Sequence, residues 1–224
     1  SNNSDPKDPS SKPQDIPSVM GEAKLWLDAK SIDGQNNATL SDYDKIGFWK
    51  DLSGNGNHAE QTTESNKPTL KLSEHVQIGV DFDGSNDKLI GKKDEYRTLI
   101  MVLKQDTSSG LDMIFACTCW DKSLRYENGR PRSYPDANDW HYQQASKVYI
   151  NGVKTTNVPV NGYHIIQTYR TRSFGGMSFT YTLSSDQYSR RFSGKISEII
   201  AFDRELSTTE SMQIDDYLKS KWSL

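Results

Sequence analysis

The feature that most constrains the fold is an alternation of apolar and polar residues that recurs from Glu22 onward. It is clearest in residues 76–82, where Val76, Ile78, Val80 and Phe82 occupy every second position. Successive side chains of a β-strand point to opposite faces, so this pattern buries one face and leaves the other in water. Turn residues interrupt the alternation about every ten positions, which is typical of antiparallel β proteins. The chain is therefore expected to be all-β.

Other strands are predicted from the same kind of pattern. Residues 98–103 are apolar on both faces and suit the middle of a sandwich, and residues 112–119 are expected to pair beside them. Residues 147–156 read as a hairpin, because Asn151 and Gly152 tolerate the positive φ of a type I′ turn. Two further strands are expected at residues 177–183 and 195–202.

The C-terminal region changes from a period of two to helical spacing. Residues 207–210, Ser-Thr-Thr-Glu, match a capping box, in which a serine and a glutamate satisfy the first backbone N–H groups of a helix. The apolar residues that follow at helical spacing are Ile214, Tyr217, Leu218 and Trp222. One short C-terminal α-helix is predicted to pack on the sandwich.

The chain of 224 residues suits one β-domain with an N-terminal extension. Half of its eight prolines lie in residues 1–18, among Ser, Asp, Lys and Asn. We therefore predict a flexible tether over residues 1–21 and a single domain over residues 22–224. The net charge of −3 provides no large field of one sign, so nucleic acid and anionic membrane surfaces are not expected partners.

Five short segments carry a resemblance to a known superfamily. They are Leu-Trp-Leu-Asp at 25–28, Asp-Leu-Ser-Gly-Asn-Gly-Asn-His-Ala at 51–59, Val-Asp-Phe-Asp-Gly at 80–84, Gly-Lys-Ile-Ser-Glu-Ile-Ile-Ala-Phe-Asp at 194–203, and Lys-Trp at 221–222. With them the chain resembles the concanavalin A-like lectin and laminin-G superfamily, in its bacterial extracellular branch. The resemblance covers residues 24–90 and 192–224 and implies a two-sheet antiparallel jelly-roll sandwich with a short C-terminal helix.

The resemblance also bears on localisation. A polar, proline-rich tether before a surface-type domain is similar to a mature bacterial lipoprotein just after its acylated cysteine, which would precede Ser1. The protein is therefore expected either to lie on the extracellular face of the outer membrane, in contact with the membrane only through the lipid anchor, or to be secreted. An interdomain linker fits the same composition.

Catalysis is not expected. Glycoside hydrolases of the superfamily carry two carboxylates at alternating positions of one strand, and no segment of this chain matches that motif. Glu198 and Asp203 are five positions apart, which places them on opposite faces of a regular strand, so Glu198 is interpreted as a structural or rim carboxylate. His58, His75, His141 and His164 lack a spaced catalytic partner. Glycoside hydrolysis remains the third functional class.

No cofactor is predicted. Oxygen donors alternate over residues 51–57, but Thr62 stands at the twelfth position, where a calcium loop requires an acidic residue. The segment is interpreted as a tight turn held by Asx side chains and glycines. Calcium at the sandwich rim is not indicated by any diagnostic spacing, and its candidate ligands are Asp83, Asp87, Asp136 and Asp139. Cys117 and Cys119 are expected to be free thiols, and with His141 they form only a weak zinc pattern.

The predicted recognition site lies in the aromatic segment 120–142. Its candidate ligand-binding residues are Trp120, Tyr126, Arg130, Tyr134, Asn138, Trp140 and Tyr142. Sugar rings stack on Trp and Tyr, while Arg and Asn read their hydroxyl groups. The same residue types are enriched at protein interfaces, and a purely structural role for these aromatics is the third interpretation. Residues 163–174, which include Tyr169, could flank the same face or form a solvated strand edge.

These observations predict a non-catalytic extracellular recognition domain. Its expected partner is a glycan or polysaccharide, and by analogy it serves as an accessory to an outer-membrane nutrient importer. The alternative is a protein-binding or assembly subunit of a cell-surface or virion complex that binds no glycan.

Overall fold

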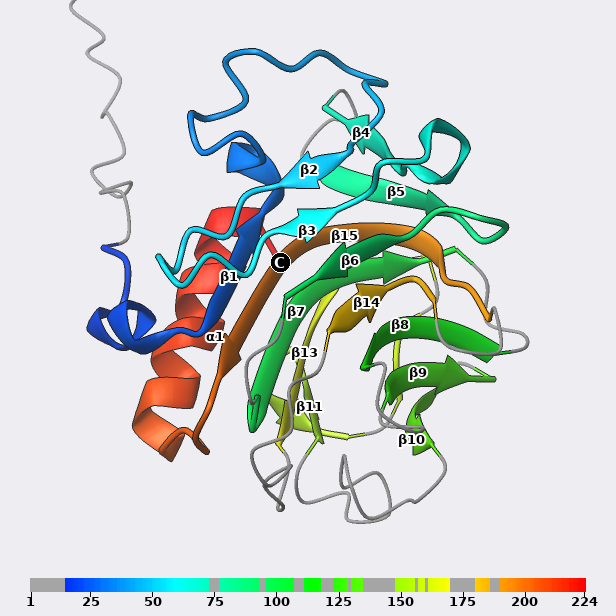
Figure 1. The fold of residues 1–224 in the computed structure, drawn as a ribbon. Helices are drawn as coiled ribbons and strands as arrows, with labels where there is room; N and C mark the ends of the chain where they lie inside the picture. Colours follow the sequence, from blue (N-terminus) through cyan, green and yellow to red (C-terminus); the bar gives the residue numbers. More distant parts are fainter. Residues whose placement is uncertain are drawn as a thin grey trace, which may run out of the picture.

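The computed structural model describes residues 15–72, 77–92, 96–106, 111–117, 123–128, 130–134, 148–155, 157–159, 161–169, 180–185 and 190–224. Within these residues the chain forms two antiparallel β-sheets that face each other, and a single α-helix lies outside them (Figure 1). The prediction of an all-β, two-sheet sandwich with a C-terminal helix is confirmed.

The first sheet has eight strands in the order β12-β11-β13-β7-β15-β5-β4, with β1 also paired to β15. Its strands are β1 (Leu25–Asp28), β4 (Thr69–Lys71), β5 (Gly79–Asp83), β7 (Thr98–Gln105), β11 (Val148–Ile150), β12 (Val153–Lys154), β13 (His164–Tyr169) and β15 (Ser193–Phe202). The second sheet has seven strands in the order β10-β9-β8-β14-β6-β3-β2. They are β2 (Phe48–Trp49), β3 (Ala59–Glu60), β6 (Leu89–Gly91), β8 (Leu111–Cys117), β9 (Ser123–Glu127), β10 (Arg130–Tyr134) and β14 (Tyr181–Leu183).

Strand β7 is central, as its two apolar faces predict, but its expected neighbour was wrong. Residues 112–119 were expected beside it, whereas β8 belongs to the second sheet and pairs with β9 and β14. The neighbours of β7 are β13 and β15. The physical reason is that the apolar character of a strand predicts that it is buried but does not predict which strand it pairs with. Two strands from later in the chain, β13 and β15, occupy the edges of β7, and the chain after β7 crosses to the opposite sheet.

Strand β15 pairs with three other strands of the first sheet. A β-bulge between Ile196 and Glu198 shifts its register. On one edge β15 pairs with β5 before the bulge and with the N-terminal strand β1 after it, while β7 occupies the other edge. Strands from the N-terminal and C-terminal parts of the domain therefore pair directly in this sheet.

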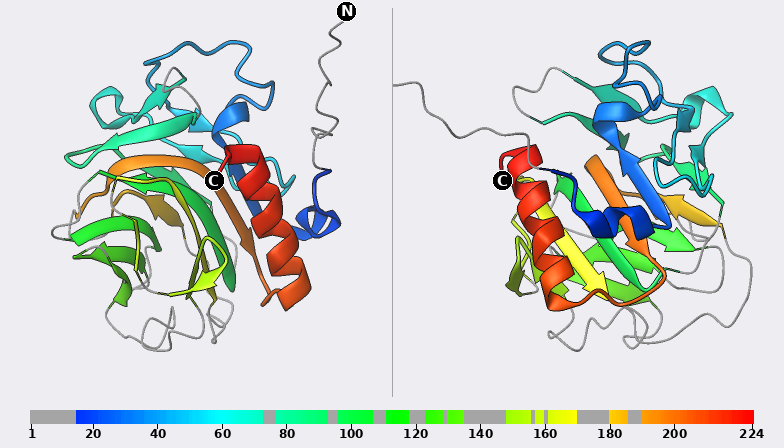
Figure 2. Two further views of the ribbon diagram at one scale, coloured as in Figure 1. Left: turned by 180° about the vertical axis from the view of Figure 1, so that it is seen from behind. Right: turned by 90° about the vertical axis from the view of Figure 1, so that its left-hand side faces the viewer.

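The helix α1 (Thr208–Trp222) begins at the predicted capping box. The Ser207 hydroxyl accepts from the Glu210 N–H, and the Glu210 carboxylate accepts from the Ser207 N–H. The helix lies across the outer face of the first sheet, over β13 and beside β1 (Figure 2). Its buried apolar residues are those predicted from the spacing, Ile214, Tyr217, Leu218 and Trp222.

Three short 3-10 helices complete the described elements: η1 (Ser18–Glu22), η2 (Ala29–Ser31) and η3 (Glu64–Asn66). In η1 the side chains of Val19 and Met20 are buried in the core. The packed domain therefore includes residues on the N-terminal side of the boundary that the sequence predicts at residue 22.

The polar turn over residues 51–57 is confirmed as an Asx-type structure. The Asp51 carboxylate, only 3% exposed, accepts hydrogen bonds from the backbone N–H groups of Trp26, Ser53 and Asn57 and from the Ser53 hydroxyl. The Asn57 amide donates to the Lys24 carbonyl. The turn thus ties the loop before β3 to the start of β1.

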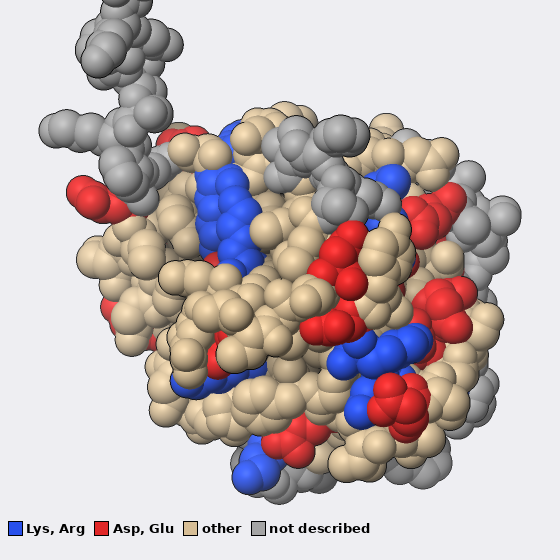
Figure 3. Space-filling model, turned by 90° about the horizontal axis from the view of Figure 1, so that it is seen from above, with Lys and Arg blue, Asp and Glu red and all other residues tan. Residues whose placement is uncertain are grey.

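Charged residues are mixed on the face seen from above in Figure 3, where Lys and Arg lie next to Asp and Glu. This agrees with the small net charge of −3. Of the helices that the structure describes, none combines the length and the apolar character that crossing a membrane requires.

Candidate functional site

Most of the predicted recognition segment lies outside the described residues, including Trp120, Asn138, Trp140 and Tyr142. Tyr134 ends β10, and only its backbone is described. Arg130 begins the same strand and is exposed.

The remaining predicted residue, Tyr126, is fully buried, and its hydroxyl lies 2.8 Å from Nε2 of His164 on the opposite sheet. His164 Nδ1 lies 3.0 Å from the Gly162 carbonyl, which can only accept, so Nδ1 carries the proton and Nε2 accepts from Tyr126. Tyr126 therefore joins the two sheets within the core and presents no ring to a surface ligand.

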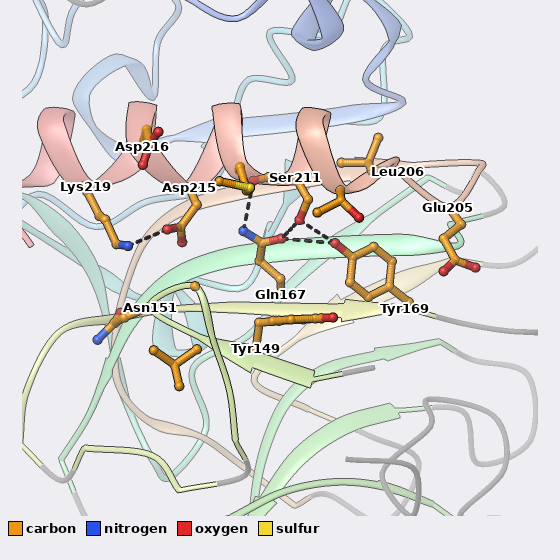
Figure 4. Close-up of a pocket in the computed structure, with 14 residues that line it drawn as sticks. Tyr149, Asn151, Gln167, Tyr169, Glu205, Leu206, Ser211, Asp215, Asp216 and Lys219 are labelled. Atoms are coloured by element: carbon orange, nitrogen blue, oxygen red, sulfur yellow. Dashed lines mark hydrogen bonds and ion pairs between the residues drawn. The ribbon is translucent and has the colours of Figure 1, made fainter. Parts of the chain in front are cut away.

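The described residues form a pocket of about 450 Å³ between α1, the β11–β12 hairpin and β13 (Figure 4). This volume lies within the range of small-molecule sites, about 300–1,000 Å³. The pocket is polar and aromatic, and it opens on the outer face of the first sheet. No ligand was predicted at this place from the sequence.

The strand side of the pocket follows from the register of β11 and β13. Tyr149 and Gln167 are direct cross-strand partners, so their side chains project from the same face of the sheet. Tyr169 is two residues further along β13 and projects on that face as well. The rings of Tyr149 and Tyr169 meet edge to face, with centroids 6.1 Å apart. Tyr149 is half-buried and keeps part of its ring available to the pocket.

A hydrogen-bonded triad joins the sheet to α1. The Tyr169 hydroxyl lies 2.6 Å from the Ser211 hydroxyl, and the Gln167 side-chain carbonyl lies 3.2 Å from the first and 2.5 Å from the second. Each hydroxyl has one proton, so two of these three contacts are hydrogen bonds at any one time. Burial raises the pKa of the Tyr169 hydroxyl, and the hydrogen bond with Ser211 opposes that rise without cancelling it. Tyr169 is therefore a neutral phenol near pH 7.

The hairpin turn closes the opposite end of the pocket. Asn151 and Gly152 both have positive φ, +52° and +78°, so the predicted type I′-compatible turn is confirmed. A Cβ on Gly152 would lie 2.7 Å from Oδ2 of Asp215 on α1 and 3.2 Å from Nζ of Lys219. Asp215 and Lys219, one helical turn apart, form an ion pair of 2.5 Å. Glycine is thus required by the backbone conformation and also by the close approach of the helix.

A buried ionic cluster fixes the C-terminal end of α1 and hence this wall of the pocket. Glu198 of β15 is 1% exposed and accepts from Nε1 of Trp26 at 2.8 Å and from Nε1 of Trp222 at 2.6 Å. Nζ of Lys221 bridges the carboxylates of Glu198, at 2.7 Å, and Asp28, at 2.6 Å. This gives Glu198 a structural role and accounts for the Lys-Trp pair at the end of the helix.

Burial and neighbouring charges shift the pKa values of this cluster in opposite directions. Burial raises the pKa of the Glu198 carboxyl, and the nearby Asp28 charge adds to the rise, although Lys221 opposes it. Burial lowers the pKa of Lys221, but the attraction of Glu198 and Asp28 outweighs it and leaves that pKa raised. Lys221 therefore remains charged under ordinary conditions and offsets the two facing carboxylates.

The N-terminal end of α1 is held by ion pairs. Arg204 bridges Glu22 and Glu210 through its guanidinium group, with both shortest contacts at 2.7 Å. Glu210 is the residue that also caps the helix, and its pKa is lowered to about 2 by the side-chain hydrogen bond from Arg204 and by the hydrogen bonds at Ser207. Both ends of α1 are therefore held in place, which fixes the helical wall of the pocket.

The described calcium candidates hold a turn after β5. Asp83 Oδ1 accepts from the N–H groups of Ser85, Asn86 and Asp87, and Asp87 Oδ2 accepts from the Asp83 N–H. The other two candidates, Asp136 and Asp139, lie outside the described residues, as do Cys119 and His141 of the weak zinc pattern. Among the described residues, no group of three or more His, Cys, Asp or Glu side chains is placed to hold a metal ion.

Part of the pocket was visible in the sequence. The turn at Asn151-Gly152 was predicted, and Tyr169 belongs to residues 163–174, which were considered as a flank of the recognition face. The helical side was missed, although Ser211, Asp215 and Lys219 recur every four residues and therefore share one face of the helix. What the sequence could not supply was the strand against which that face packs.

The chain was compared with known proteins at the levels of family, sequence and structure. No protein-family model, no curated protein and no solved structure matches it.

Proposed function

We propose that this chain is a non-catalytic recognition domain of the concanavalin A-like type and that it binds a glycan in the pocket between α1 and the β11–β12 hairpin. The observation that carries the proposal is the partly exposed ring of Tyr149 beside hydroxyl, amide and carboxylate groups in one cavity of about 450 Å³. Sugars commonly bind through a pairing of this kind, in which an aromatic face stacks on the ring and polar groups bind its hydroxyls.

The polar groups come from different elements that are rigidly held. Gln167 and Tyr169 are buried on β13, and Ser211 faces them from α1. Because the triad holds these side chains in one arrangement before any ligand binds, the wall of the pocket is preorganised, which lowers the entropic cost of binding.

A protein partner is the second candidate, and one observation favours it. Val153 on the hairpin and Met212 on the helix both line the pocket and are 63% and 60% exposed. Exposed apolar side chains beside a groove are a common feature of protein docking sites. In this reading the pocket would receive a side chain of the partner.

The proposed setting is the cell surface, through an N-terminal lipid anchor or after secretion, with a role as accessory to an outer-membrane importer. The support is the sequence resemblance and the composition of the N-terminal segment. A catalytic role is not proposed: the facing carboxylates of Glu198 and Asp28 are buried beneath α1 and share Lys221, so they lack the access to substrate that hydrolysis requires.

The test is a glycan array probed with the wild-type protein and three variants. Tyr149→Ala removes the aromatic face of the pocket, and Tyr43→Ala is the matched control, since Tyr43 is 65% exposed and lies outside the pocket lining. The double variant Tyr134→Ala, Trp140→Ala addresses the aromatic segment predicted from the sequence.

Saturable glycan binding that is lost in Tyr149→Ala and kept in Tyr43→Ala is the expected result. Binding lost only in the double variant would move the site to the aromatic segment. Failure of the folded wild-type protein to bind any glycan would reject the proposal in favour of the protein partner. Circular dichroism of each variant shows whether the fold is retained.

A further inference from the structure

The pocket between α1 and the β11–β12 hairpin is closed at one end by the turn of the hairpin. A Cβ on Gly152 would lie only 2.7 Å from Oδ2 of Asp215 and 3.2 Å from Nζ of Lys219. Both of these side chains line the pocket, and Figure 4 shows them on the helix at the end where Asn151 lies. Because even one added carbon atom would overlap the carboxylate, a ligand cannot continue between the turn and the helix at this point.

Both sides of this closing contact are held in place. On the sheet side, the Asn151 N–H donates to the Ile165 carbonyl at 2.9 Å, and the Ile165 N–H donates to Oδ1 of Asn151 at 2.8 Å. These two hydrogen bonds tie the turn to β13. On the helix side, Asp215 is 5% exposed and its carboxylate pairs with Lys219 at 2.5 Å. The closed end is therefore a wall built from tied segments and not the tip of a free loop.

The base of the pocket is closed as well. Oγ of Ser211 on α1 lies 2.5 Å from Oε1 of the buried Gln167 on β13, which joins the helix directly to the sheet. The mouth is marked by Val153 and Met212, which line the pocket from the hairpin and from the helix and are exposed. Both the mouth and the end near the start of the helix lie on the same side of the closing turn. A chain that runs along the pocket can therefore leave it in one direction only.

This shape distinguishes the end of a glycan chain from its interior. An interior sugar residue is bonded to a neighbour on each side, so beside the closed end its chain would have to turn back on itself. A terminal residue has one neighbour and needs one way out. The lining on the helix extends from Lys219 back to Thr208, which corresponds to about 16 Å of helix, so the pocket accommodates a short segment of chain.

From these observations we infer that the pocket binds the terminal residue of a glycan chain, with the free end against the turn at Asn151 and Gly152 and the rest of the chain directed away from it. The inference rests on the proposed glycan-binding function. It names the ligand class as chain ends, as opposed to the interior of a polysaccharide.

The experiment uses linear oligosaccharides of glucose, galactose, mannose or N-acetylglucosamine. Each is titrated by calorimetry against the full chain in three forms: with both ends free, with a bulky aromatic group on the reducing end, and with the same group on the non-reducing end. The form blocked at the recognised end should bind at least about tenfold more weakly than the free form, because the added group must displace packed atoms of the wall. The form blocked at the other end should keep its affinity.

The double variant Asp215→Ala, Lys219→Ala tests the position of the closed end. It removes both partners of the ion pair together, so neither charge is left unpaired, and it opens a passage beside the turn. The oligosaccharide blocked at the recognised end should regain affinity relative to the free form by about fivefold or more. The control Glu64→Ala, Lys67→Ala removes an ion pair of the same length outside the pocket lining and should leave that ratio unchanged.

The outcomes separate the two proposals. Absence of binding to every oligosaccharide by the folded wild-type protein rejects the glycan-binding function and the inference together. Equal affinity for all three forms, or an equal loss in the two blocked forms, overturns the inference and leaves the glycan-binding function intact. An unchanged ratio in the folded Asp215→Ala, Lys219→Ala protein contradicts the assignment of the closed end to the turn. The titrations with the wild-type protein decide the inference even if that variant fails to fold.

Discussion

Asp28 and Glu198 are direct cross-strand partners on β1 and β15, yet both carboxylates are buried and share the ammonium group of Lys221. Like charges that face each other across two strands destabilise a sheet. Here a side chain from the last turn of the helix supplies the opposite charge. The arrangement makes the pairing of the first and last strands dependent on the docking of the helix.

The substitution Lys221→Met tests this dependence. It removes the ammonium group that two facing buried carboxylates share, and breaking a buried ion pair in this way costs about 3–5 kcal/mol of unfolding free energy. Urea denaturation followed by tryptophan fluorescence measures the loss. The control is Lys67→Met, which breaks the ion pair with the exposed Glu64 and is expected to cost less than about 1 kcal/mol. Equal midpoints for both variants would contradict a stabilising role of Lys221.

Acid sensitivity is expected to arise from His164. Burial lowers its pKa to about 4 from the ordinary 6.5, so between these values the unfolded chain binds a proton that the folded protein does not. The contribution of His164 to stability is therefore complete above pH 6.5 and is lost as the pH falls toward 4, by about 3 kcal/mol. Unfolding free energies measured across this pH range give the slope of stability against pH.

The double variant His164→Leu, Tyr126→Phe isolates that slope. It replaces the polar pair that joins the two sheets by apolar side chains and removes the titrating group together with its partner. The double variant should lose less stability between pH 6.5 and pH 4 than the wild-type protein does. The same slope in both proteins would show that other groups cause the acid sensitivity.

The turn at residues 51–57 should depend on its carboxylate and not on calcium. Asp51→Ala leaves backbone N–H groups of Trp26, Ser53 and Asn57 without their acceptor, which we expect to cost about 3 kcal/mol. Thermal unfolding measures the loss, and Asp51→Asn, which keeps one acceptor oxygen, should lie between the alanine variant and the wild-type protein. Millimolar calcium or a chelator should leave the wild-type Tm unchanged. A marked rise of Tm with calcium would favour a metal site at this turn.

Substitution of Gly152, in the hairpin turn, is expected to destabilise the fold more than substitution of Gly54, which also has positive φ. Gly152→Ala adds a Cβ against Asp215 and Lys219 as well as the strain of positive φ. Gly54→Ala, at φ +86° with open space around it, adds the strain alone, roughly 1–2 kcal/mol. Gly152→Ala should therefore lose more unfolding free energy and also weaken ligand binding in the pocket. Equal losses would show that the helix moves away from the turn at little cost.

The local elements of this fold could be predicted because each depends on residues close in sequence. The hairpin turn at Asn151-Gly152, the capping box at Ser207 and Glu210 and the Asx turn at Asp51 are of this kind. The pairing of β8 could not, because the choice between two sheets depends on which distant strands occupy the edges of β7. Local pattern therefore predicts the elements, and long-range pairing determines their neighbours.

The candidate site likewise has features that could be predicted from local sequence and features that depend on long-range packing. Tyr126 was predicted to bind ligand from its place in an aromatic segment, but composition does not distinguish a ring on the surface from one in the core, and here the first sheet covers it. Asp215 was not singled out, because an acidic residue on a helix is usually solvated. Its burial arises from the turn at Gly152, more than sixty positions earlier in the chain.

The central place of β15 affects how the protein reaches its fold during synthesis. Strands β1, β5 and β7 are synthesised well before β15, and each of them pairs with it. Until β15 is made, the edges that it will occupy have no permanent partner. Because contacts between segments so far apart in sequence form slowly, these edges should stay open to chaperones and to aggregation until β15 has emerged from the ribosome and the first sheet is complete.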